Sequence, residues 1–584
     1  MSWLVALSTS QRAEAPPLPA TPLRTVAQPG LTVAVGGNPD TCAFHSDADS
    51  SSGWAVVGTG ILLGGLRATM MTHADWANVL SRPDVDPRTL DGHFVAMRWR
   101  GETIEIFTDQ LGLRTLYWGE CAGGIFVSTR LDWVTAATGH DDLDFQALGS
   151  RWLLFNQMSY ASGVKQIGRL GPGGRAQFRS GSLMGSTVTP WIPQSEPASP
   201  VEALDLAGAF VGCALDHQLT PALALSGGLD SRLLLAFLVG SGNADFTTYS
   251  IGDPADPDVR VAGEMTSHLN LRHSHYCDPL PDPHTCLEHL RSYVAQVHLV
   301  EPASTWSKLR YYPILRERGQ LVIDGGYGEF GRRQFFNRAV RLGRAAVRAR
   351  DGKGLIHLVR HVRADIFVPE VTRSLEEGAL AALQEALDSM PARRLDPGDF
   401  MDLLAVRFRI PNSGGPEQAR QDSEVLNFMP LAQPSYLRAV LAVPAHFRAN
   451  GRAYYDRIRM MDSRLMRFPR VKGGDTIPFG LSTNLSWLIA RARALAGKGY
   501  VDPRPDELLM RLREYVLDLV RSAAVSGNGI YDDRKVVAAV DRYYRGDGRG
   551  RSAVDWWLTF ELWKQALGGS PGQGSNPGGA RRYR

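Results

Sequence analysis

Apolar and polar positions form short alternating runs, separated by turn residues, over the first third of the chain. Runs of this kind are typical of β-strands that pack one face against a core. The apolar N-terminal run at residues 1–7 is interpreted as a first strand, and residues 72–80 have a helical pattern. We therefore predict a sheet-rich first domain over residues 1–190, with further strands at 31–35, 54–58, 94–98, 104–108 and 124–128.

The pattern changes after residues 191–200, a segment dense in Pro and Ser that we interpret as a linker. A helical pattern over about 201–218 then leads into apolar strand runs that alternate with helical ones. This alternation predicts a parallel α/β sheet, whose ligand binds at the carboxyl ends of the strands. We predict a second domain over residues 201–567 and a disordered Gly-rich tail over 568–584, with strands of the second domain at 222–225, 246–251 and 320–323.

The most informative segment follows the strand at 222–225 and reads Ser226-Gly227-Gly228-Leu229-Asp230-Ser231. Glycines let the backbone approach a ligand closely, and the N-terminus of the next helix offers N–H groups and partial positive charge, so the segment predicts a pyrophosphate-binding loop. Asp230 is placed to hold the Mg²⁺ that accompanies phosphates. The segment lacks the lysine of a Walker A loop. It resembles the PP-loop of ATP pyrophosphatases, which implies cleavage of ATP between the α and β phosphates; a strand–turn–helix with incidental glycines is the alternative.

Composition narrows the class of protein further. The chain has 584 residues, enough for two or more domains, and is 44% apolar and 21% charged, as in ordinary globular proteins. A net charge of +4 provides no general attraction to nucleic acid or membranes. No apolar run approaches the roughly 18–20 residues that span a bilayer. The five cysteines are odd in number and lack CxxC spacing, which predicts a cytoplasmic protein without a zinc site.

A family resemblance appears in the first domain. Asp-Gly-His-Phe at 91–94, followed by residues 109–118, closely resembles the glutaminase-type domain of asparagine synthetases, and residues 163–164 and 171–173 resemble its closing strand. With the PP-loop, the resemblance to the asparagine synthetase superfamily covers roughly residues 30–565. It implies an α/β fold: an N-terminal αββα Ntn-glutaminase-like domain, then a PP-loop ATP pyrophosphatase-type parallel α/β domain with helical additions. It also implies ATP and Mg²⁺ as cofactors.

The chain departs from this family at its amino terminus. A working glutaminase of this class needs a cysteine directly after the initiator methionine, and this chain has Ser2, with Cys42 as the nearest cysteine. A serine hydroxyl is a far poorer nucleophile than a thiol at neutral pH. We therefore predict that the first domain has lost glutamine hydrolysis; Ser2 acting as an N-terminal nucleophile is the alternative. β-Lactam synthetases and the macrolactam synthetases of lasso peptides share this loss.

A second segment of the synthetase domain, Ile-Asp-Gly-Gly-Tyr-Gly-Glu-Phe at 323–330, resembles the Ser-Gly-x-Gly-x-Asp-Glu segment of asparagine synthetases. The resemblance implies that Gly325 and Gly326 bind the nucleotide. It places Glu329 where the family has its second Mg²⁺-binding aspartate. Tyr327 resembles the tyrosine that β-lactam synthetases have at the reacting end of the substrate, with simple loop packing as the alternative.

Further positions follow from the same resemblance. Ser250 ends the second strand, beside the adenine and ribose in the family, and nearby Asp258 is either a ligand or a solvated loop acid. Glu301 lies in a segment that resembles the acceptor side of the family's pocket, with a helix-start acid as the alternative. Lys472 matches a lysine that stabilises negative charge during acyl attack; a surface lysine in a glycine loop is the alternative. Glu424 is the nearest candidate for the partner acid of β-lactam synthetases.

The function implied by the resemblance is an ATP-dependent, AMP-forming amide-bond synthetase with Lys472, Tyr327 and Glu424 as catalytic residues. The preferred substrate is a lasso-type ribosomal peptide with its leader removed, whose N-terminal amine attacks an Asp or Glu side chain to close a macrolactam ring. A leader peptidase or leader-binding protein is a further candidate partner; no nucleic-acid or membrane partner is expected. The alternatives are a small-molecule β-lactam-type synthetase, an ammonia-dependent asparagine synthetase, and a non-catalytic nucleotide- or peptide-binding scaffold.

Arginines recur at helical spacing between Arg332 and Arg350, with Ala, Val and Leu among them. This spacing predicts an amphipathic helix with a solvated basic face. A docking surface for an acidic peptide is the alternative.

Overall fold

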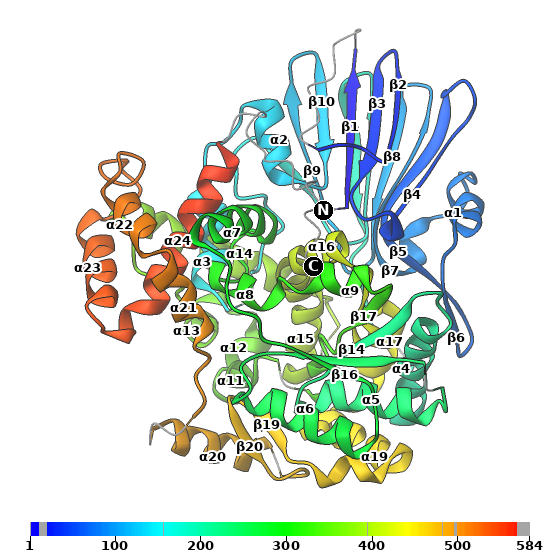
Figure 1. Ribbon diagram of the computed structural model, residues 1–584. Helices are drawn as coiled ribbons and strands as arrows, with labels where there is room; N and C mark the ends of the chain where they lie inside the picture. The colour runs from blue at the N-terminus through cyan, green and yellow to red at the C-terminus, as the bar shows by residue number, and fades with distance from the viewer. Residues whose placement is uncertain are drawn as a thin grey trace.

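The described residues form two antiparallel sheets, one parallel sheet and one short hairpin (Figure 1). The structure is a computed structural model, and it describes residues 2–10, 20–155, 157–194, 196–243, 245–333, 335–393, 395–481, 483–495 and 499–568. The predicted tail at 568–584 lies outside these residues apart from Gly568. Among the helices of the described ranges, none is both long and apolar enough to cross a membrane.

The antiparallel sheets are built from the first part of the chain. The first has strand order β11-β9-β10-β1-β3-β2, and the second has order β13-β12-β8-β7-β5-β4 with β6 paired to β5. All six strands predicted in this region are found. The bounds are β1 (Trp3–Thr9), β2 (Arg24–Gln28), β3 (Leu31–Gly36), β4 (Cys42–Ser46), β5 (Ser52–Gly64), β6 (Arg67–Met70), β7 (Asp91–Arg100), β8 (Thr103–Thr108), β9 (Leu116–Cys121), β10 (Gly124–Ser128), β11 (Gly168–Leu170), β12 (Gly174–Arg179) and β13 (Ser182–Val188).

Side-chain alternation explains why these two sheets pack face to face. Leu4 of β1 packs in one core with Val57 of β5, whereas its neighbour Val5 points to the other side of the first sheet and joins the main core. On the outer face of the second sheet, Trp54 packs with Trp76 of α1 (His73–Leu80). Helix α2 (Leu131–Thr138) contacts β9 and β10 on the outer face of the first sheet. Burial on both faces makes β1 an apolar run without a polar face.

The parallel sheet lies in the second part of the chain, with strand order β16-β15-β14-β17-β18. The three strands predicted here are found as β15, β14 and β17, so the mixed α/β class with a parallel sheet is confirmed. Strand β16 was missed because its sequence, His-Ser-His-Tyr, contains no apolar run, and β18 has only two residues. The bounds are β14 (Thr220–Ala224), β15 (Thr247–Ile251), β16 (His273–Tyr276), β17 (Gln320–Ile323) and β18 (Asn427–Phe428); the hairpin consists of β19 (Arg470–Lys472) and β20 (Asp475–Ile477).

Helices surround the parallel sheet and form most of the chain beyond it (Figure 1). Helix α4 begins where the predicted linker ends, because Ser199 and Glu202 form a capping box around Pro200. The bounds are α3 (Phe145–Leu153), α4 (Pro200–Leu215), α5 (Leu229–Gly240), α6 (Pro257–His268), α7 (Pro283–Val297), α8 (Trp306–Leu309), α9 (Tyr312–Glu317), α10 (Glu329–Arg332), α11 (Asn337–Leu342), α12 (Arg344–Ala349), α13 (Gly352–Val359), α14 (Pro369–Asp388), α15 (Pro397–Leu404), a π-helix η4 (Ala405–Gly414), α16 (Gly415–Glu424), α17 (Pro434–Ala442), α18 (Ala445–Arg448), α19 (Arg452–Met461), α20 (Thr483–Leu495), α21 (Arg504–Arg511), α22 (Arg513–Arg521), α23 (Asp533–Tyr544) and α24 (Arg551–Leu567). The 3₁₀ turns are η1 (Pro39–Thr41), η2 (Pro87–Thr89), η3 (Ala303–Thr305), η5 (Pro430–Ala432), η6 (Ala449–Gly451), η7 (Ser463–Arg467) and η8 (Gly548–Gly550).

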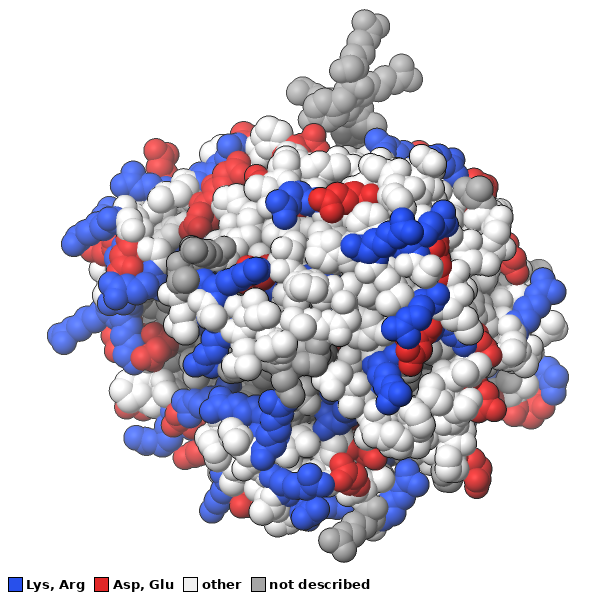
Figure 2. Space-filling model, turned by 90° about the horizontal axis from the view of Figure 1, so that it is seen from below, with Lys and Arg blue, Asp and Glu red and all other residues white. Residues whose placement is uncertain are grey.

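The prediction of one basic helix from Arg332 to Arg350 is wrong. The segment forms three short helices, α10, α11 and α12, because Arg333 and Phe336 adopt left-handed backbone conformations and Gly343 separates the last two. Several arginines are also engaged within the chain, as in the ion pair of Arg344 with Asp396. Figure 2 shows Lys and Arg interspersed with Asp and Glu on the face seen from below, rather than a face covered by basic side chains alone.

Candidate active site

A cavity of about 390 Å³ lies over the carboxyl ends of β14, β15 and β17. The chain order of the strands reverses between β14 and β17, and such a reversal is where open α/β sheets bind their ligands. Helix α5 begins at Leu229 directly after the loop, with Gly228 as its N-cap, so its positive end lies at the cavity. Nine of the predicted residues line the cavity: Ser226, Gly228, Asp230, Ser231, Ser250, Gly325, Gly326, Tyr327 and Glu329.

The PP-loop is held by its own hydroxyl groups. The Ser226 and Ser231 hydroxyl oxygens lie 3.0 Å apart, and the Gly228 N–H donates to the Ser226 oxygen at 3.1 Å. The Ser250 hydroxyl donates to the Leu225 carbonyl at 2.8 Å and so ties β15 to the loop. The loop is therefore preorganised, with two hydroxyls at the cavity wall.

Two predicted nucleotide-binding residues do not line the cavity. The Gly227 N–H donates to the Asp258 carboxylate at 2.8 Å, and Leu229 is buried in the core. Asp258 thus positions the loop backbone rather than lying in solvent. The pKa of Asp258 is raised by burial and, in addition, by the charge of Asp256. The hydrogen bond from the Gly227 N–H lowers it.

Asp230 is the most heavily desolvated acid of the loop. Its Oδ2 accepts from Arg332 Nη2 at 2.5 Å, while its buried Oδ1 has no hydrogen-bond partner among the described residues. A side chain at Gly328 would approach the Asp230 carboxyl carbon to 2.3 Å, so only glycine permits this packing. The pKa of Asp230 is raised by burial and, in addition, by the charge of Glu329. The charge of Arg332 lowers it.

The donor set fits Mg²⁺. Within the described part of the chain, no group of three His, Cys, Asp or Glu side chains forms a metal site by itself. Mg²⁺ usually binds one or two carboxylates together with substrate phosphates. Asp230, with its unpartnered oxygen, and Glu329 supply two such carboxylates at the same cavity.

A third carboxylate at this cavity, Asp324, was missed by the sequence reasoning. It directly follows β17, at the carboxyl end of a predicted strand, and this position is the signal that could have identified it. Its Oδ1 accepts from the Gly326 N–H at 2.7 Å. Burial raises the pKa of Asp324, with Glu417 and Glu329 adding to the effect.

Tyr327 closes one side of the cavity with a strained backbone. Its φ is +67°, and a side chain at Gly414 of η4 would lie 2.2 Å from the Tyr327 hydroxyl. Burial raises the pKa of Tyr327, so the phenol is protonated at neutral pH. Arg409 and Ser413 of η4 oppose this shift, which shows that the π-helix faces the tyrosine.

Glu424 is not brought to the cavity; it lies at the end of α16, outside the cavity lining. Glu417, at the start of the same helix, is the acid whose charge acts on Asp324 and on Glu301. The pKa of Glu301 is itself raised, mainly by burial and to a smaller extent by the charge of Glu417. The sequence reasoning missed Glu417 because its proximity depends on how α16 packs rather than on a motif.

Lys472 lies on the hairpin beside the PP-loop, outside the cavity lining. The neighbouring Val471 N–H donates to the Gly227 carbonyl at 3.0 Å, which fastens the hairpin to the loop. Lys472 is half-buried, and its pKa is lowered by burial and then by Arg470 and Arg332. The hairpin and α10 thus place Lys472, Arg470 and Arg332 near one another beside the loop.

Residues 209–297 match the family model of asparagine synthase. This stretch runs from α4 to α7 and contains the whole PP-loop and Ser250. The chain is 26% identical over 200 residues to a glutamine-hydrolysing asparagine synthetase of Asparagus officinalis, a match that covers 31% of this chain and 34% of the relative. A second glutamine-hydrolysing asparagine synthetase, from Brassica oleracea, is 25% identical over 264 residues. This match covers 41% of this chain and 40% of the relative.

These comparisons support the asparagine synthetase superfamily, and the chain spans 34% and 40% of the length of these two relatives. Two solved structures are also similar. Glutamine phosphoribosylpyrophosphate (PRPP) amidotransferase from B. subtilis, complexed with ADP and GMP, is 11% identical with a TM-score of 0.19, covering 55% of this chain and 75% of that one. The allosteric regulatory enzyme of purine biosynthesis is 10% identical with a TM-score of 0.20, covering 59% and 72%. TM-scores of this size do not establish a shared fold.

Ser2 lies in a second polar centre, which includes Arg114 of the first part of the chain and Asp422 of α16. Its hydroxyl is 2.6 Å from that of Thr41, accepts from the Asn38 N–H at 3.1 Å and donates to the Asp422 carbonyl at 3.3 Å. The Asp422 carboxylate accepts from Arg114 at 2.6 Å and lies 3.0 Å from His93 Nε2. Ser2 and Asp422 are completely buried, so α16 fills this centre with a carboxylate of the chain itself.

Cys42, the cysteine nearest to Ser2 along the chain, also adjoins this centre. Burial raises the pKa of the Cys42 thiol to about 11, against the opposing effects of Arg114 and Ser2. At neutral pH it is therefore a thiol rather than a nucleophilic thiolate.

Proposed function

We propose that the protein is an ATP-dependent amide-bond synthetase that releases AMP and pyrophosphate. One observation carries the proposal. The PP-loop hydroxyls, the positive end of α5 and the carboxylates Asp230 and Glu329 surround one cavity at the switch point of a parallel sheet. This arrangement suits a nucleoside triphosphate with its Mg²⁺.

In the first step a substrate carboxylate oxygen attacks the α-phosphorus of ATP, and the bond from that phosphorus to the bridging oxygen of pyrophosphate breaks. Ser226, Gly228 and Ser231 hold the phosphates, and Asp230 and Glu329 would hold Mg²⁺. Bound Mg²⁺ would neutralise charge on the phosphate oxygens. Lys472 on the adjoining hairpin neutralises charge on the leaving pyrophosphate.

In the second step an amine attacks the acyl carbon of the adenylate, loses a proton and displaces AMP. Tyr327, from its place at the cavity wall, orients the reacting end of the substrate. Glu417, which also lies outside the cavity lining and accepts from Arg420 at 2.7 Å, replaces Glu424 as the candidate acid because its charge acts on Glu301. When both reacting groups belong to one molecule, binding it in a folded form supplies a high effective molarity.

The amine is proposed to come from the substrate itself, because the Ser2 centre is filled and lacks a cysteine nucleophile. The preferred substrate remains a leader-free precursor peptide that is closed to a lasso-type macrolactam in the cytoplasm, with a leader peptidase or leader-binding protein as partner. An ammonia-dependent asparagine synthetase is the second candidate, favoured by the match of residues 209–297 to asparagine synthase. A β-lactam-type substrate would use the same residues.

Product analysis tests these proposals. The protein is incubated with ATP and Mg²⁺ and, in turn, with aspartate plus ammonium, small amino-carboxylates, and precursor peptides with and without leader. AMP and pyrophosphate with a leader-free peptide, together with a peptide lighter by one water, would establish the macrolactam synthetase. AMP with aspartate and ammonium would establish the second candidate. ADP in place of AMP would overturn the mechanism.

A further inference from the structure

The π-helix η4 contacts the active-site cavity at one end and the first part of the chain along its length. A side chain at Gly414, its last residue, would lie 2.2 Å from the Tyr327 hydroxyl, so the end of η4 packs directly on this tyrosine. Tyr327 in turn lines the PP-loop cavity. π-Helices are rare and are found mostly at functional sites. The groups that fix the conformation of η4 therefore also fix one wall of the cavity.

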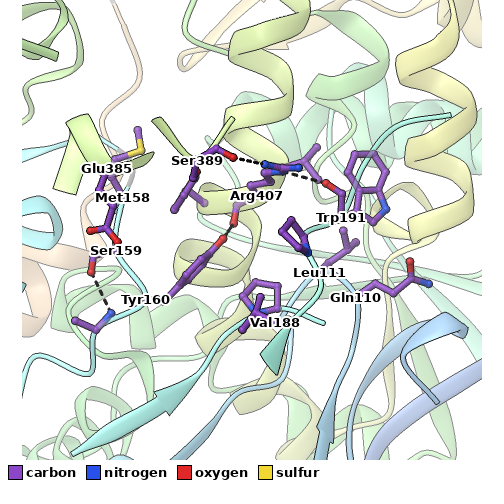
Figure 3. A pocket seen from close by; sticks show the side chains of 15 residues that line it. Gln110, Leu111, Met158, Ser159, Tyr160, Val188, Trp191, Glu385, Ser389 and Arg407 are labelled. Atoms are coloured by element: carbon purple, nitrogen blue, oxygen red, sulfur yellow. Dashed lines mark hydrogen bonds between the residues drawn. The ribbon is translucent and has the colours of Figure 1, made fainter. Parts of the chain in front are cut away.

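The sequence of η4 interrupts its own hydrogen bonding. Pro411 has no N–H, so in an α-helix the carbonyl four residues earlier, that of Arg407, would lack its donor. The Tyr160 hydroxyl, from the segment before β11, donates to this carbonyl (Figure 3). The Arg407 side chain donates to the carbonyls of Trp191 and Ser389, each at 3.0 Å (Figure 3). Side-chain and backbone groups from outside the helix thus hold the start of η4.

The second half of η4 is held by an arginine of the first sheet. Arg169 of β11 donates from Nη1 to the Asn412 side-chain oxygen at 2.7 Å and from Nη2 to the Pro411 carbonyl at 3.3 Å. Asn412 is only 1% exposed, and its amide donates to the Gln157 carbonyl at 3.1 Å. The next two residues of η4 are the ones that adjoin Tyr327. Arg169 therefore bonds to η4 immediately before its contact with the tyrosine.

We propose that Tyr160 and Arg169 are positioning residues for Tyr327, which they hold in place through η4. The inference rests on the proposed role of Tyr327 in the synthetase reaction. It gives the first part of the chain, whose Ser2 centre lacks a cysteine nucleophile, a role in that reaction, because this part sets the cavity wall at the reacting end of the substrate. The PP-loop is held by other groups, among them Asp258 and Val471, so ATP binding does not depend on the two positioning residues.

Fluorine NMR on the full-length protein tests the proposal without any need for ATP turnover. A fluorotyrosine is placed at position 327 alone, and its signal reports the surroundings of that ring in the folded protein. Arg169→Gln removes the paired bonds to η4 and should shift or split the signal. Tyr160→Phe keeps the ring that stacks on Phe408 at 5.0 Å, removes only the hydroxyl, and should also change the signal. A variant that lowers only the global stability would lower the melting temperature and leave this native-state signal in place.

Hydrogen exchange followed by mass spectrometry locates the change. In both variants, amide exchange should rise about fivefold in residues 405–414 and 323–330, as expected for the loss of one hydrogen bond, and stay unchanged in the PP-loop at 226–231. Arg179→Gln, at an exposed position of β12, is the matched control and should change neither the fluorine signal nor the exchange. An unchanged fluorine signal in both variants, an equal change in the control, or exchange raised equally in the PP-loop would each overturn the proposal.

Binding of the fluorescent ATP analogue mant-ATP separates this proposal from the proposed function. The unmodified protein and all three variants should bind it with equal affinity, because the PP-loop is held independently of η4. If the unmodified protein does not bind mant-ATP, the ATP-dependent function is wrong, and the fluorine and exchange results still decide whether Tyr160 and Arg169 position Tyr327. Weaker mant-ATP binding by Arg169→Gln or Tyr160→Phe would contradict a role confined to Tyr327.

Discussion

The Ser2 centre and the PP-loop cavity use similar polar residues in opposite ways. In the Ser2 centre, the serine hydroxyl and the Asp422 carboxylate are fully buried, and each is satisfied by other groups of the chain. At the PP-loop cavity, Asp230 has a buried oxygen without a partner among the described residues, and two serine hydroxyls line an open volume of about 390 Å³. Buried polar groups in proteins are nearly always satisfied, so the partnerless oxygen of Asp230 marks a place where a ligand can bind, whereas Ser2 and Asp422 are held by the chain itself.

The same contrast gives the Ser2 centre a structural explanation. Asp422 comes from α16 and pairs with His93 of β7 and with Arg114 of the loop between β8 and β9, so the centre joins two parts of the chain. Removing one partner of a buried ion pair leaves an uncompensated charge, which makes such a cluster costly to lose. The predictions below test this division between a structural and a ligand-binding centre.

The largest effect is expected for Asp230→Asn, which keeps the shape of the side chain and removes its charge. Release of AMP from ATP should fall about a thousandfold, because the carboxylate that would hold Mg²⁺ is lost. Chromatographic measurement of AMP, with Mn²⁺ binding followed by electron paramagnetic resonance, provides the test. Asp245→Asn, whose side chain is exposed, serves as the control and should change neither result. Undiminished AMP release by the Asp230 variant would remove this residue from the site.

Asp422→Ala should destabilise the protein by about 3–5 kcal/mol, because it leaves Arg114 and His93 buried without their acceptor. Urea unfolding followed by tryptophan fluorescence measures the change. Asp456→Ala, which removes an exposed ion pair with Arg459, is the matched control and should cost less than about 1 kcal/mol. Similar losses from both variants would contradict a structural role for the Ser2 centre.

Lys472→Ala should lower the rate of AMP formation about a hundredfold, since it removes a cation beside the PP-loop. Lys353→Ala, at an exposed position of α13, should leave the rate unchanged. Because the pKa of Lys472 is lowered, the pH dependence of activity provides a second test. The ammonium charge is lost as pH rises through that lowered pKa, so activity should decline at lower alkaline pH than for an ordinary lysine. Lys472→Arg should extend activity to higher pH, and an unchanged alkaline limb would exclude a role for this charge.

Ser2→Cys should not create glutaminase activity, because the side chain at position 2 is completely buried among groups of the chain. Glutamate release from glutamine, measured enzymatically after removal of Met1, should stay at the level of the unmodified protein. Measurable glutamate formation would show that glutamine reaches this centre and that a missing thiol is its sole defect.

The smallest expected effect is on the rate at which Cys42 is chemically labelled, and not on activity. With a pKa of about 11, its thiolate fraction at pH 8 is about one in a thousand. Iodoacetamide followed by peptide mass spectrometry should modify the exposed Cys277 first, and modification of Cys42 should rise only as pH approaches 11. Equal rates for both cysteines at pH 8 would mean that the Ser2 centre opens to solvent.

Local elements of the fold could be predicted well from the chain alone. The PP-loop is a continuous strand–loop–helix segment, so apolar runs on both sides of Gly227 and Gly228 were enough to find it. The short strands β16 and β18 and the π-helix η4 gave no such signal, because they are stabilised by their neighbours rather than by their own periodicity. The prediction of one basic helix from Arg332 to Arg350 was wrong. The arginines have helical spacing, but residues with left-handed backbone conformations interrupt the helix.

The sequence by itself determined the loop, the mixed α/β class and most of the residues that line the cavity, since each depends on residues close together in the chain. Only the tertiary structure decided that Arg332 pairs with Asp230, 102 positions away, and that Asp422 enters the Ser2 centre from 420 positions away. It also decided that Glu417, rather than Glu424, acts on the acids near the cavity. Periodicity carries information about the face on which a residue lies; the partner that reaches this face is set by how distant elements pack.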